Sequence, residues 1–476
     1  MSDSGGTIRF PCDALPSEGA QARLLGLYPQ RQSGLFMQRV RIPGGVISAA
    51  QWRAVAEASA RHAPGYPLHL TTRQDIEIHG VPPERIPALQ RDLYAAGLST
   101  VRACGDTLRN VTLCPGNALC EGTVDVAPAA EAITRAAEGM AMIRALPRKF
   151  KVSLSACPKA CALPWINDLG LIARTEGGFA AVVAGSLGPR PATGLALERV
   201  FAAAEVAPLA RAALRLFNAE GDRVNRGRAR LRHVRERLGD AEFVARLTAL
   251  FDEERVARGD PAPPLRRVTG ASPRQVRLRP RLGNIAILDA LELGRAVEKA
   301  GASLRVGFEH DLFLFGGNGL TLPPALAARE GAPAIVACPG SAWCGRAIVD
   351  THEPVAAMDR ALGSDFGGLV AVSGCPNGCA QSSVGAIGLA GCVRTIAGAR
   401  RPCFRLLVGG GGGRDARLAR EIHPGIDAAV IPGVVRMLAE RYRSRVGQED
   451  LSFADWALTR TEELPAEIGR VEGWAL

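Results

Sequence analysis

The chain has 476 residues, 47% apolar and 22% charged, and these values exclude disordered, collagen-like and coiled-coil proteins. Its 58 lysines and arginines exceed its 47 aspartates and glutamates by 11 charges, which predicts an anionic partner. No apolar run of about 18 residues occurs, and residues 1–10 are polar and glycine-rich rather than signal-like. We therefore expect a cytoplasmic protein that does not enter a membrane.

Helical and strand patterns alternate along the chain, which predicts an α/β or α+β fold. In chain order, the patterns predict a helix over 50–61, a strand over 68–78, arginine-rich helical structure over 222–258, a helix over 288–299 and a strand over 305–314. Residues 259–273 are rich in proline and glycine, which places a linker and a boundary near residue 265. We expect the arginine-rich stretch to be solvated or to lie between domains, because no aromatic residues interleave its charges as in a nucleic-acid site.

Several segments occur twice, which indicates an internal duplication. The matching pairs are 68–80 with 304–316, 113–120 (LCPGNALC) with 337–344 (ACPGSAWC), and 155–162 (SACPKACA) with 373–380 (SGCPNGCA). We therefore expect two copies of one unit related by a pseudo-two-fold axis.

Each copy holds one C-x5-C pair and one C-x3-C pair, which is the ligand count of an iron–sulfur cube. The pairs are Cys114/Cys120 and Cys157/Cys161 in the first copy, and Cys338/Cys344 and Cys375/Cys379 in the second. Zinc sites usually pair their cysteines as C-x2-C to C-x4-C, and a chain without a signal peptide is a poor candidate for disulfides. The spacing favours a cluster over zinc, and either metal over eight metal-free thiols.

Residues 337–348 and 374–389 resemble the siroheme and 4Fe-4S signature of the assimilatory, ferredoxin-type nitrite and sulfite reductases. The resemblance extends to residues 26–31, 36–45, 71–75, 108–111 and 146–151. It implies an α+β, pseudo-two-fold fold of ferredoxin-like half-domains and two siroheme reductase-type α/β domains. The implied boundaries are 1–100 for the first half-domain, 101–225 for the first reductase-type domain, 226–265 for a helical linker, 266–330 for the second half-domain and 331–476 for the second reductase-type domain.

The resemblance also implies a site. Cys338, Cys344, Cys375 and Cys379 would hold a 4Fe-4S cluster, and Cys379 would also be the axial ligand of one siroheme. Arg39, Arg73 and Gln74 lie in segments that line the siroheme, although Arg73 could instead brace its own turn.

The substrate face would use Arg41, Arg109, Lys149 and Lys151 to bind a small oxyanion and deliver protons. Reducing such an anion requires fixed positive charge, which arginine supplies, and a rechargeable proton donor, which lysine supplies. Lys149 and Lys151 are half of the four lysines in the chain, and strand alternation would point both to one face.

The first copy departs from the family pattern, because Cys114, Cys120, Cys157 and Cys161 are all present there. They could hold a second cluster that relays electrons, or they could be an ancestral remnant without metal. Phe308-Glu309 stands where the first copy has Thr72-Arg73, so we expect one siroheme and not two. The glycine run at 409–413 lacks the third glycine of G-x-G-x-x-G and predicts a tight strand-to-helix turn.

The resemblance predicts an oxidoreductase that reduces nitrite to ammonia, or sulfite to sulfide, with six electrons from an acidic ferredoxin-like protein. Cys344 to Ile348 is more typical of the nitrite branch and Ile78 to Gly80 of the sulfite branch. The alternative enzyme is precorrin-3B synthase of cobalamin biosynthesis, which shares the fold and cluster but has no need of an oxyanion cage. A non-enzymatic zinc or nucleic-acid-binding module would instead be colourless and bind polyanions with a steep salt dependence.

Overall fold

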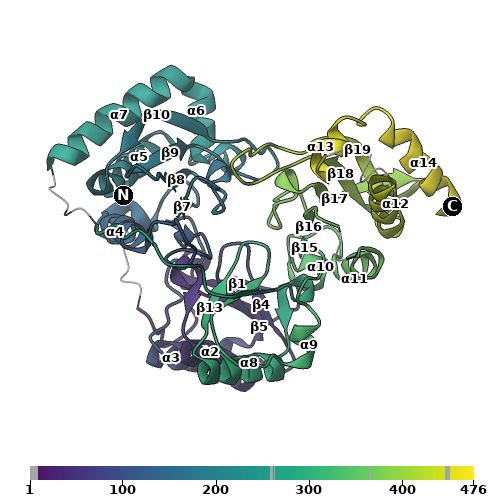
Figure 1. Cartoon of the computed structure of the whole chain (residues 1–476), viewed down its shortest axis with the longest axis horizontal. Coiled ribbons are helices and arrows are strands. Elements are labelled where there is room, and N and C mark those ends of the chain that lie inside the picture. The colour runs from purple at the N-terminus through teal and green to yellow at the C-terminus, as the bar shows by residue number, and fades with distance from the viewer. Residues whose placement is uncertain (1–8, 258–260, 262, 364–365, 445–450, 476) are drawn as a thin grey trace.

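A computed structural model of the chain describes residues 9–257, 261, 263–363, 366–444 and 451–475. The elements form three lobes, each built on its own sheet or pair of sheets (Figure 1). We call them the first, central and second lobes: the first spans 104–257, the second spans 335–475, and the central lobe combines 19–98 with 275–327. Within the described ranges, no helix is long and apolar enough to cross a membrane.

The central lobe joins the two copies by exchanged strands. Its first sheet has the order β1-β2-β5-β4-β12, and its second has the order β11-β14-β13-β3. Strand β12 comes from the second copy and pairs antiparallel with β4, whereas β3 comes from the first copy and pairs antiparallel with β13. Helices α2 and α8 pack together, and the Trp52 indole donates a hydrogen bond of 2.7 Å to the Ala290 carbonyl. One hydrophobic core therefore serves both half-domains.

The strands of the central lobe are β1 (Leu27–Pro29), β2 (Phe36–Val40), β3 (Val46–Ile47), β4 (Leu68–Leu70), β5 (Ile76–Val81), β11 (Gln275–Leu278), β12 (Asn284–Ile285), β13 (Ser303–Val306) and β14 (Leu312–Phe315). Its helices are α1 (Gly19–Leu24), α2 (Ala49–His62), α3 (Ile86–Ala95), α8 (Ile287–Ala300) and α9 (Pro324–Ala327).

The first and second lobes repeat one sheet topology, with two parallel pairs followed by two antiparallel pairs. The first lobe contains β6 (Thr112–Leu113), β7 (Val152–Ser155), β8 (Leu169–Ala173), β9 (Phe179–Val183), β10 (Leu195–Phe201), α4 (Ala127–Glu138), α5 (Val206–Glu220), α6 (Leu231–Leu238) and α7 (Asp240–Ala257). The second lobe contains β15 (Ile335–Ala337), β16 (Val370–Ser373), β17 (Ile387–Ile396), β18 (Ala399–Val408), β19 (Arg420–Asp427), α10 (Gly340–Trp343), α11 (His352–Ala361), α12 (Ile431–Arg443), α13 (Phe453–Leu458) and α14 (Leu464–Ala475). This repetition confirms the predicted duplication.

The expected single strand over 68–78 is wrong, because β4 and β5 form a hairpin there. The Thr71 hydroxyl accepts hydrogen bonds from the backbone N–H groups of Arg73 (3.2 Å) and Asp75 (3.0 Å), which closes the turn. The expected strand over 305–314 likewise becomes the hairpin of β13 and β14. A polar turn that ends in a positive φ, at Gln74 or His310, reverses each chain segment.

Two further segments differ from the sequence expectations. The predicted arginine-rich stretch contains α6 and α7 between residues 231 and 257, but Leu231, Phe243 and Phe251 pack into the core of the first lobe. The glycine run 409–413 connects β18 to β19 through a Gly411–Arg417 bridge, so it is not a strand-to-helix turn.

Candidate active site

The hairpin turn between β4 and β5 reaches both other lobes. Thr72 Oγ1 donates a hydrogen bond of 2.9 Å to the Cys379 carbonyl in the second lobe. Arg73 donates to Asn167 Oδ1 (2.6 Å) and to the Asn110 carbonyl (3.1 Å) in the first lobe. Burial lowers the pKa of Arg73. Arg73 thus braces this turn against the first lobe, and its side chain lies beside the Cys379 loop.

Gln74 holds the two copies together. Its Nε2 donates to the carbonyls of Leu113 (2.8 Å) and Val306 (2.9 Å), and its Oε1 accepts from the Leu113 N–H (2.9 Å). The resemblance implies that Gln74 lines a cofactor, but its side-chain amide is engaged by the backbone of both copies.

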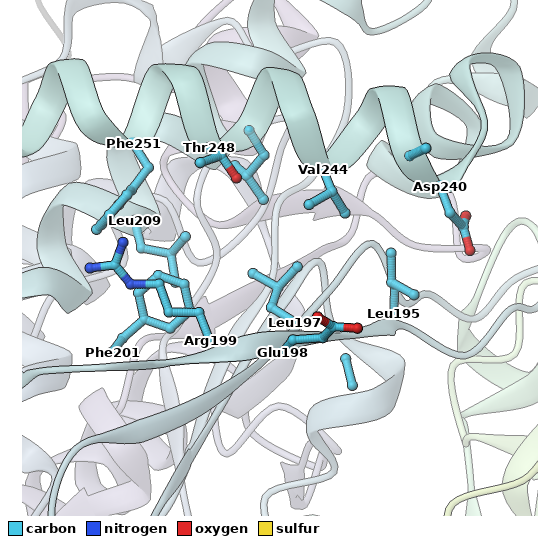
Figure 2. A pocket seen from close by; sticks show the side chains of 13 residues that line it. Leu195, Leu197, Glu198, Arg199, Phe201, Leu209, Asp240, Val244, Thr248 and Phe251 are labelled. Atoms are coloured by element: carbon cyan, nitrogen blue, oxygen red, sulfur yellow. The ribbon is translucent and has the colours of Figure 1, made fainter.

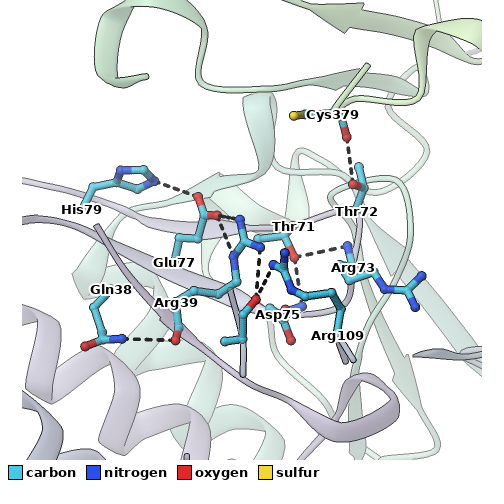
Figure 3. A network of polar contacts seen from close by, with 11 residues as sticks. Gln38, Arg39, Thr71, Thr72, Arg73, Asp75, Glu77, His79, Arg109 and Cys379 are labelled. Atoms are coloured by element: carbon cyan, nitrogen blue, oxygen red, sulfur yellow. Dashed lines mark hydrogen bonds and ion pairs between the residues drawn. The ribbon is translucent and has the colours of Figure 1, made fainter. Parts of the chain in front are cut away.

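A buried polar network lies behind this turn (Figure 3). Arg39 Nε donates to Glu77 Oε1 at 3.0 Å, and His79 Nε2 lies 3.1 Å from Glu77 Oε2. Although burial opposes the shift, Arg39 and His79 hold the pKa of Glu77 well below its ordinary value. The Ala103 carbonyl accepts hydrogen bonds from both Arg39 and Arg109. The charge of Arg39 is therefore balanced by the Glu77 carboxylate within the protein.

Arg41 and Arg109 are buried, and Arg41 Nη1 lies 4.0 Å from Glu138 Oε1, a carboxylate that also pairs with Arg102. Each has an Nε that finds no hydrogen-bond partner among the described residues, and their relative exposures are only 9% and 7%. Burial lowers the pKa of Arg41, and the neighbouring Arg102 charge adds to the shift. Because arginine stays protonated in proteins, these side chains hold fixed positive charge in a partly dehydrated place.

Lys149 and Lys151 lie in the same region. Phe150, between them, is fully buried in the core of the first lobe, whereas both lysines are only partly buried. Burial lowers the pKa of Lys149 to about 8, Cys379 opposes that shift, and Arg230 and Arg109 reinforce it. Burial and the Lys149 charge hold the pKa of Lys151 well below its ordinary value.

Arg230 joins this cluster and was missed by sequence reasoning. It precedes α6, its Nη2 donates to Asp168 Oδ2 at 2.7 Å, and the same oxygen accepts from the Lys151 N–H at 2.8 Å. Its Nε has no hydrogen-bond partner in the described part of the chain. The range 222–258 contains many arginines, and nothing in the sequence marks Arg230 as one that becomes buried.

The cysteines of the second copy lie on two loops that follow adjacent parallel strands. Cys338 directly follows β15, and its Sγ accepts a hydrogen bond of 3.2 Å from the Gly374 N–H after β16. Burial and the Cys379 charge raise the pKa of Cys338 to about 12, which places these two thiols near each other. Cys344 and Cys375 also lie within electrostatic reach of Cys379. Four thiols from two loops fit the donor set of an iron–sulfur cluster.

No three His, Cys, Asp or Glu side chains within the described ranges gather tightly enough to hold a single metal ion.

A pocket between the lobes brings these parts together. Its lining includes Thr72, Arg73, Lys151, Asn167, Phe308 and Cys379. Around it, the six cations outnumber the carboxylates of Asp75, Asp168 and Glu138, and the Nε groups of Arg41, Arg109 and Arg230 lack acceptors among the described residues; the six are Arg41, Arg73, Arg109, Lys149, Lys151 and Arg230. Burying a positive charge without a negative partner costs free energy. These surroundings therefore fit a group that carries several carboxylates, and siroheme is such a group.

A larger groove of about 470 Å3 lies elsewhere, between β10 and α7 (Figure 2). Its walls are mainly apolar, with Leu197, Val244 and Phe251 among them. It holds none of the cysteines or lysines described above.

The sequence is similar to known proteins along most of its length. Residues 104–254 and 330–452 match the nitrite and sulphite reductase 4Fe-4S domain, and residues 28–96 match the nitrite/sulfite reductase ferredoxin-like half domain. The chain is 27% identical to the assimilatory ferredoxin-dependent nitrite reductase of Haloferax mediterranei, covering 97% of this chain and 91% of that protein. It is 29% identical to the ferredoxin–nitrite reductase of Synechococcus elongatus, covering 86% of each.

The fold also matches a solved structure. The NirA protein of Mycobacterium tuberculosis superposes with a TM-score of 0.78 over 92% of this chain and 89% of that one, at 23% sequence identity. None of the relatives named here is a corrinoid enzyme, and no finding favours that alternative. Because the 4Fe-4S domain match alone covers more than half of the sequence, the chain belongs to the nitrite and sulphite reductase family of oxidoreductases.

Proposed function

We propose that this protein is a siroheme-containing, ferredoxin-dependent nitrite reductase that converts nitrite to ammonia with six electrons. The observation that carries the proposal is the cluster of buried, under-neutralised cations beside Cys379, especially Lys149 with its pKa lowered to about 8. Similarity to reductases named for nitrite supports this substrate over sulfite.

Positive charge has two separate tasks in this reaction. Arg41 and Arg109 are permanent cations, so they attract the anion and stabilise negative charge on its oxygens. Lys149 and Lys151 supply protons to those oxygens so that each leaves as water. A donor whose pKa is near neutrality gives up its proton and regains it more readily than one at the ordinary value of 10.5. Arg230 would keep Lys151 in place through Asp168.

Siroheme, when bound, would supply a redox-active iron for the reduction, and Cys379 would be among the residues that hold it. Its carboxylates would be held by the buried guanidinium groups around the pocket, including Arg73 and Arg230. Cys338, Cys344, Cys375 and Cys379 would hold the 4Fe-4S cluster, which would supply electrons one at a time.

We further propose that the electrons come from an acidic ferredoxin-like protein in the cytoplasm. The net charge of +11 favours association with an acidic donor. All twelve cysteines are free thiols in the structure, which suits a reducing compartment.

The test is steady-state kinetics with nitrite and with sulfite, using reduced methyl viologen as donor and the anaerobically purified holoenzyme. Lys149→Met and Lys151→Met should keep the siroheme spectrum and lower kcat by about two to four orders of magnitude, as for a lost proton donor. Lys299→Met is the matched control, because Lys299 is exposed in the last turn of α8. Wild-type rates in both Lys149→Met and Lys151→Met would overturn the proposal. Turnover of sulfite but not nitrite by the wild type would also overturn it.

A further inference from the structure

The cysteines of the first copy lie outside the site described above. Cys114 directly follows β6, and Cys157 and Cys161 lie in the loop after β7, while Cys120 closes the first loop. Their positions relative to the strands repeat those of Cys338, Cys375, Cys379 and Cys344.

Main-chain hydrogen bonds at the two cysteine sets repeat each other. The Cys114 N–H donates to the Leu154 carbonyl at 3.2 Å, and the Cys338 N–H donates to the Val372 carbonyl at 3.1 Å. The next strand in each copy, β7 or β16, ends in a serine whose hydroxyl accepts a hydrogen bond from the loop that follows. Ser155 Oγ accepts from the Ala162 N–H at 3.1 Å, and Ser373 Oγ accepts from the Ala380 N–H at 3.2 Å.

Backbone conformations in the C-x3-C loops also correspond. Ala160 and Leu163 have φ of 56° and 54°, and their counterparts Gly378 and Gln381 both have φ of 65°. Alanine and leucine adopt this left-handed conformation only at a cost in free energy. The first loop therefore keeps the shape of the second although it has Ala160 where the second has Gly378.

The strands beside these loops repeat a close approach. A Cβ on Gly170 would lie 2.4 Å from Pro164 Cβ, and one on Gly388 would lie 2.0 Å from the Ser382 carbonyl oxygen. Both cysteine loops are thus pressed against their sheets in the same way.

The thiols of the first copy lie within electrostatic reach of one another. The Cys114 thiol faces the Cys161 thiol within hydrogen-bonding reach. Cys157 lies within electrostatic reach of both Cys114 and Cys120. As in the second copy, the first cysteine is buried and the last is exposed, at Cys114 and Cys161 here and at Cys338 and Cys379 there.

Each cysteine loop is also approached by a loop from the other copy. A Cβ on Gly412 would lie 2.6 Å from Leu163 Cδ2, and one on Gly378 would lie 3.6 Å from the Gly188 N. Gly412 and Gly413 of the glycine run therefore lie against the first cysteine loop, at Leu163 and at the Lys159 carbonyl.

One difference separates the two sets. Where Thr72 and Arg73 approach Cys379, the second copy offers Phe308, which is 8% exposed and packs into the core of the first lobe together with Cys114. Phe308 and Glu309 therefore do not repeat the arginine that lies beside the Cys379 loop, although Phe308 also lines the pocket at Cys379.

We propose that Cys114, Cys120, Cys157 and Cys161 hold a second 4Fe-4S cluster, without siroheme. Each thiol loses its proton and forms one Fe–S bond, so four cysteines complete the four irons of one cube. The proposal goes beyond the nitrite reductase function and concerns metal content alone.

The test is metal and sulfide analysis of the anaerobically purified full chain. The wild type should contain about eight non-haem irons and eight acid-labile sulfides, and Cys161→Ser and Cys157→Ser should each lower both numbers to about four. The reciprocal variant Cys375→Ser should keep the first cluster, visible by EPR after reduction as a cluster uncoupled from siroheme. Cys392→Ser is the matched control, because Cys392 belongs to neither set and should leave all counts unchanged.

Four irons in the wild type that are lost in Cys375→Ser and kept in Cys161→Ser would overturn the proposal, as would stoichiometric zinc in place of iron. If the first-set variants fail to fold, the wild-type iron and sulfide counts still decide the question, because one cluster and two clusters differ twofold. Failure of the proposed nitrite reduction would appear as missing siroheme or missing turnover, and neither changes the count that the first set contributes.

Discussion

Replacing Lys149 by Met should stabilise the cofactor-free chain while it disables the loaded enzyme. Burial and the surrounding cations lower the pKa of Lys149 from 10.5 to about 8. One pKa unit corresponds to about 1.4 kcal/mol, so the folded chain bears a cost on the order of 3 kcal/mol for charging this lysine. Methionine has a similar length and no charge, so it removes that cost.

The sign of the pH dependence follows from the direction of this shift. Between pH 8 and 10.5 the unfolded chain holds the Lys149 proton more tightly than the folded chain does, so wild-type stability rises with pH in that window. Below pH 8 both states are protonated and the cost is fully present. The variant should therefore exceed the wild type in free energy of unfolding by roughly 3 kcal/mol near pH 7, and the excess should vanish towards pH 10.5.

Urea unfolding of the cofactor-free chain under anaerobic reduction, from pH 7 to pH 10.5, measures this difference. Lys299→Met is the control, because an exposed lysine should change the free energy of unfolding by less than about 0.5 kcal/mol. A difference between Lys149→Met and the wild type that is negative or independent of pH would refute the reasoning.

Two more predictions follow from individual contacts. Cys379→Ser should lose the 4Fe-4S cluster and tightly bound siroheme together, as read from the visible spectrum and iron content, and a fully reducible siroheme still coupled to a cluster would contradict the shared ligand. Arg230→Met leaves the Asp168 carboxylate buried without its 2.7 Å partner and should cost about 3 kcal/mol in urea unfolding. Arg246→Met, at an exposed ion pair, should cost no more than about 1 kcal/mol, and equal losses in the two variants would count against a buried Arg230–Asp168 pair.

Much of the architecture could be predicted from repeated motifs. Helices 50–61 and 288–299 correspond to α2 and α8 within one residue at each end, because both have a clear apolar face. The shared face of Lys149 and Lys151 stays a prediction from strand alternation around an apolar Phe150. These features depend on local spacing, which a single sequence displays.

Features that depend on contacts between distant segments were not predictable. The sequence over 68–78 fits one continuous strand as well as a hairpin, because polar residues suit either an exposed strand position or a turn. The hydrogen bonds of the Thr71 hydroxyl, which form only in the hairpin, distinguish the two structures. Arg230 acquires its role because Asp168 lies opposite it, 62 residues away in sequence. Gln74 belongs to a motif segment, but its bonds to Leu113 and Val306 make it a bridge between copies.

The exchange of β3 and β12 makes the two copies inseparable as folding units. Strand β12 reaches β4 across more than two hundred residues, with Asn284 opposite His69. Neither sheet of the central lobe can be completed until the chain beyond residue 283 has been synthesised. Contacts this remote in sequence slow folding, because a long loop must close before they form. A nascent first copy would therefore wait with an uncovered sheet edge, and expressing the copies as two separate chains would turn this intramolecular pairing into a concentration-dependent assembly.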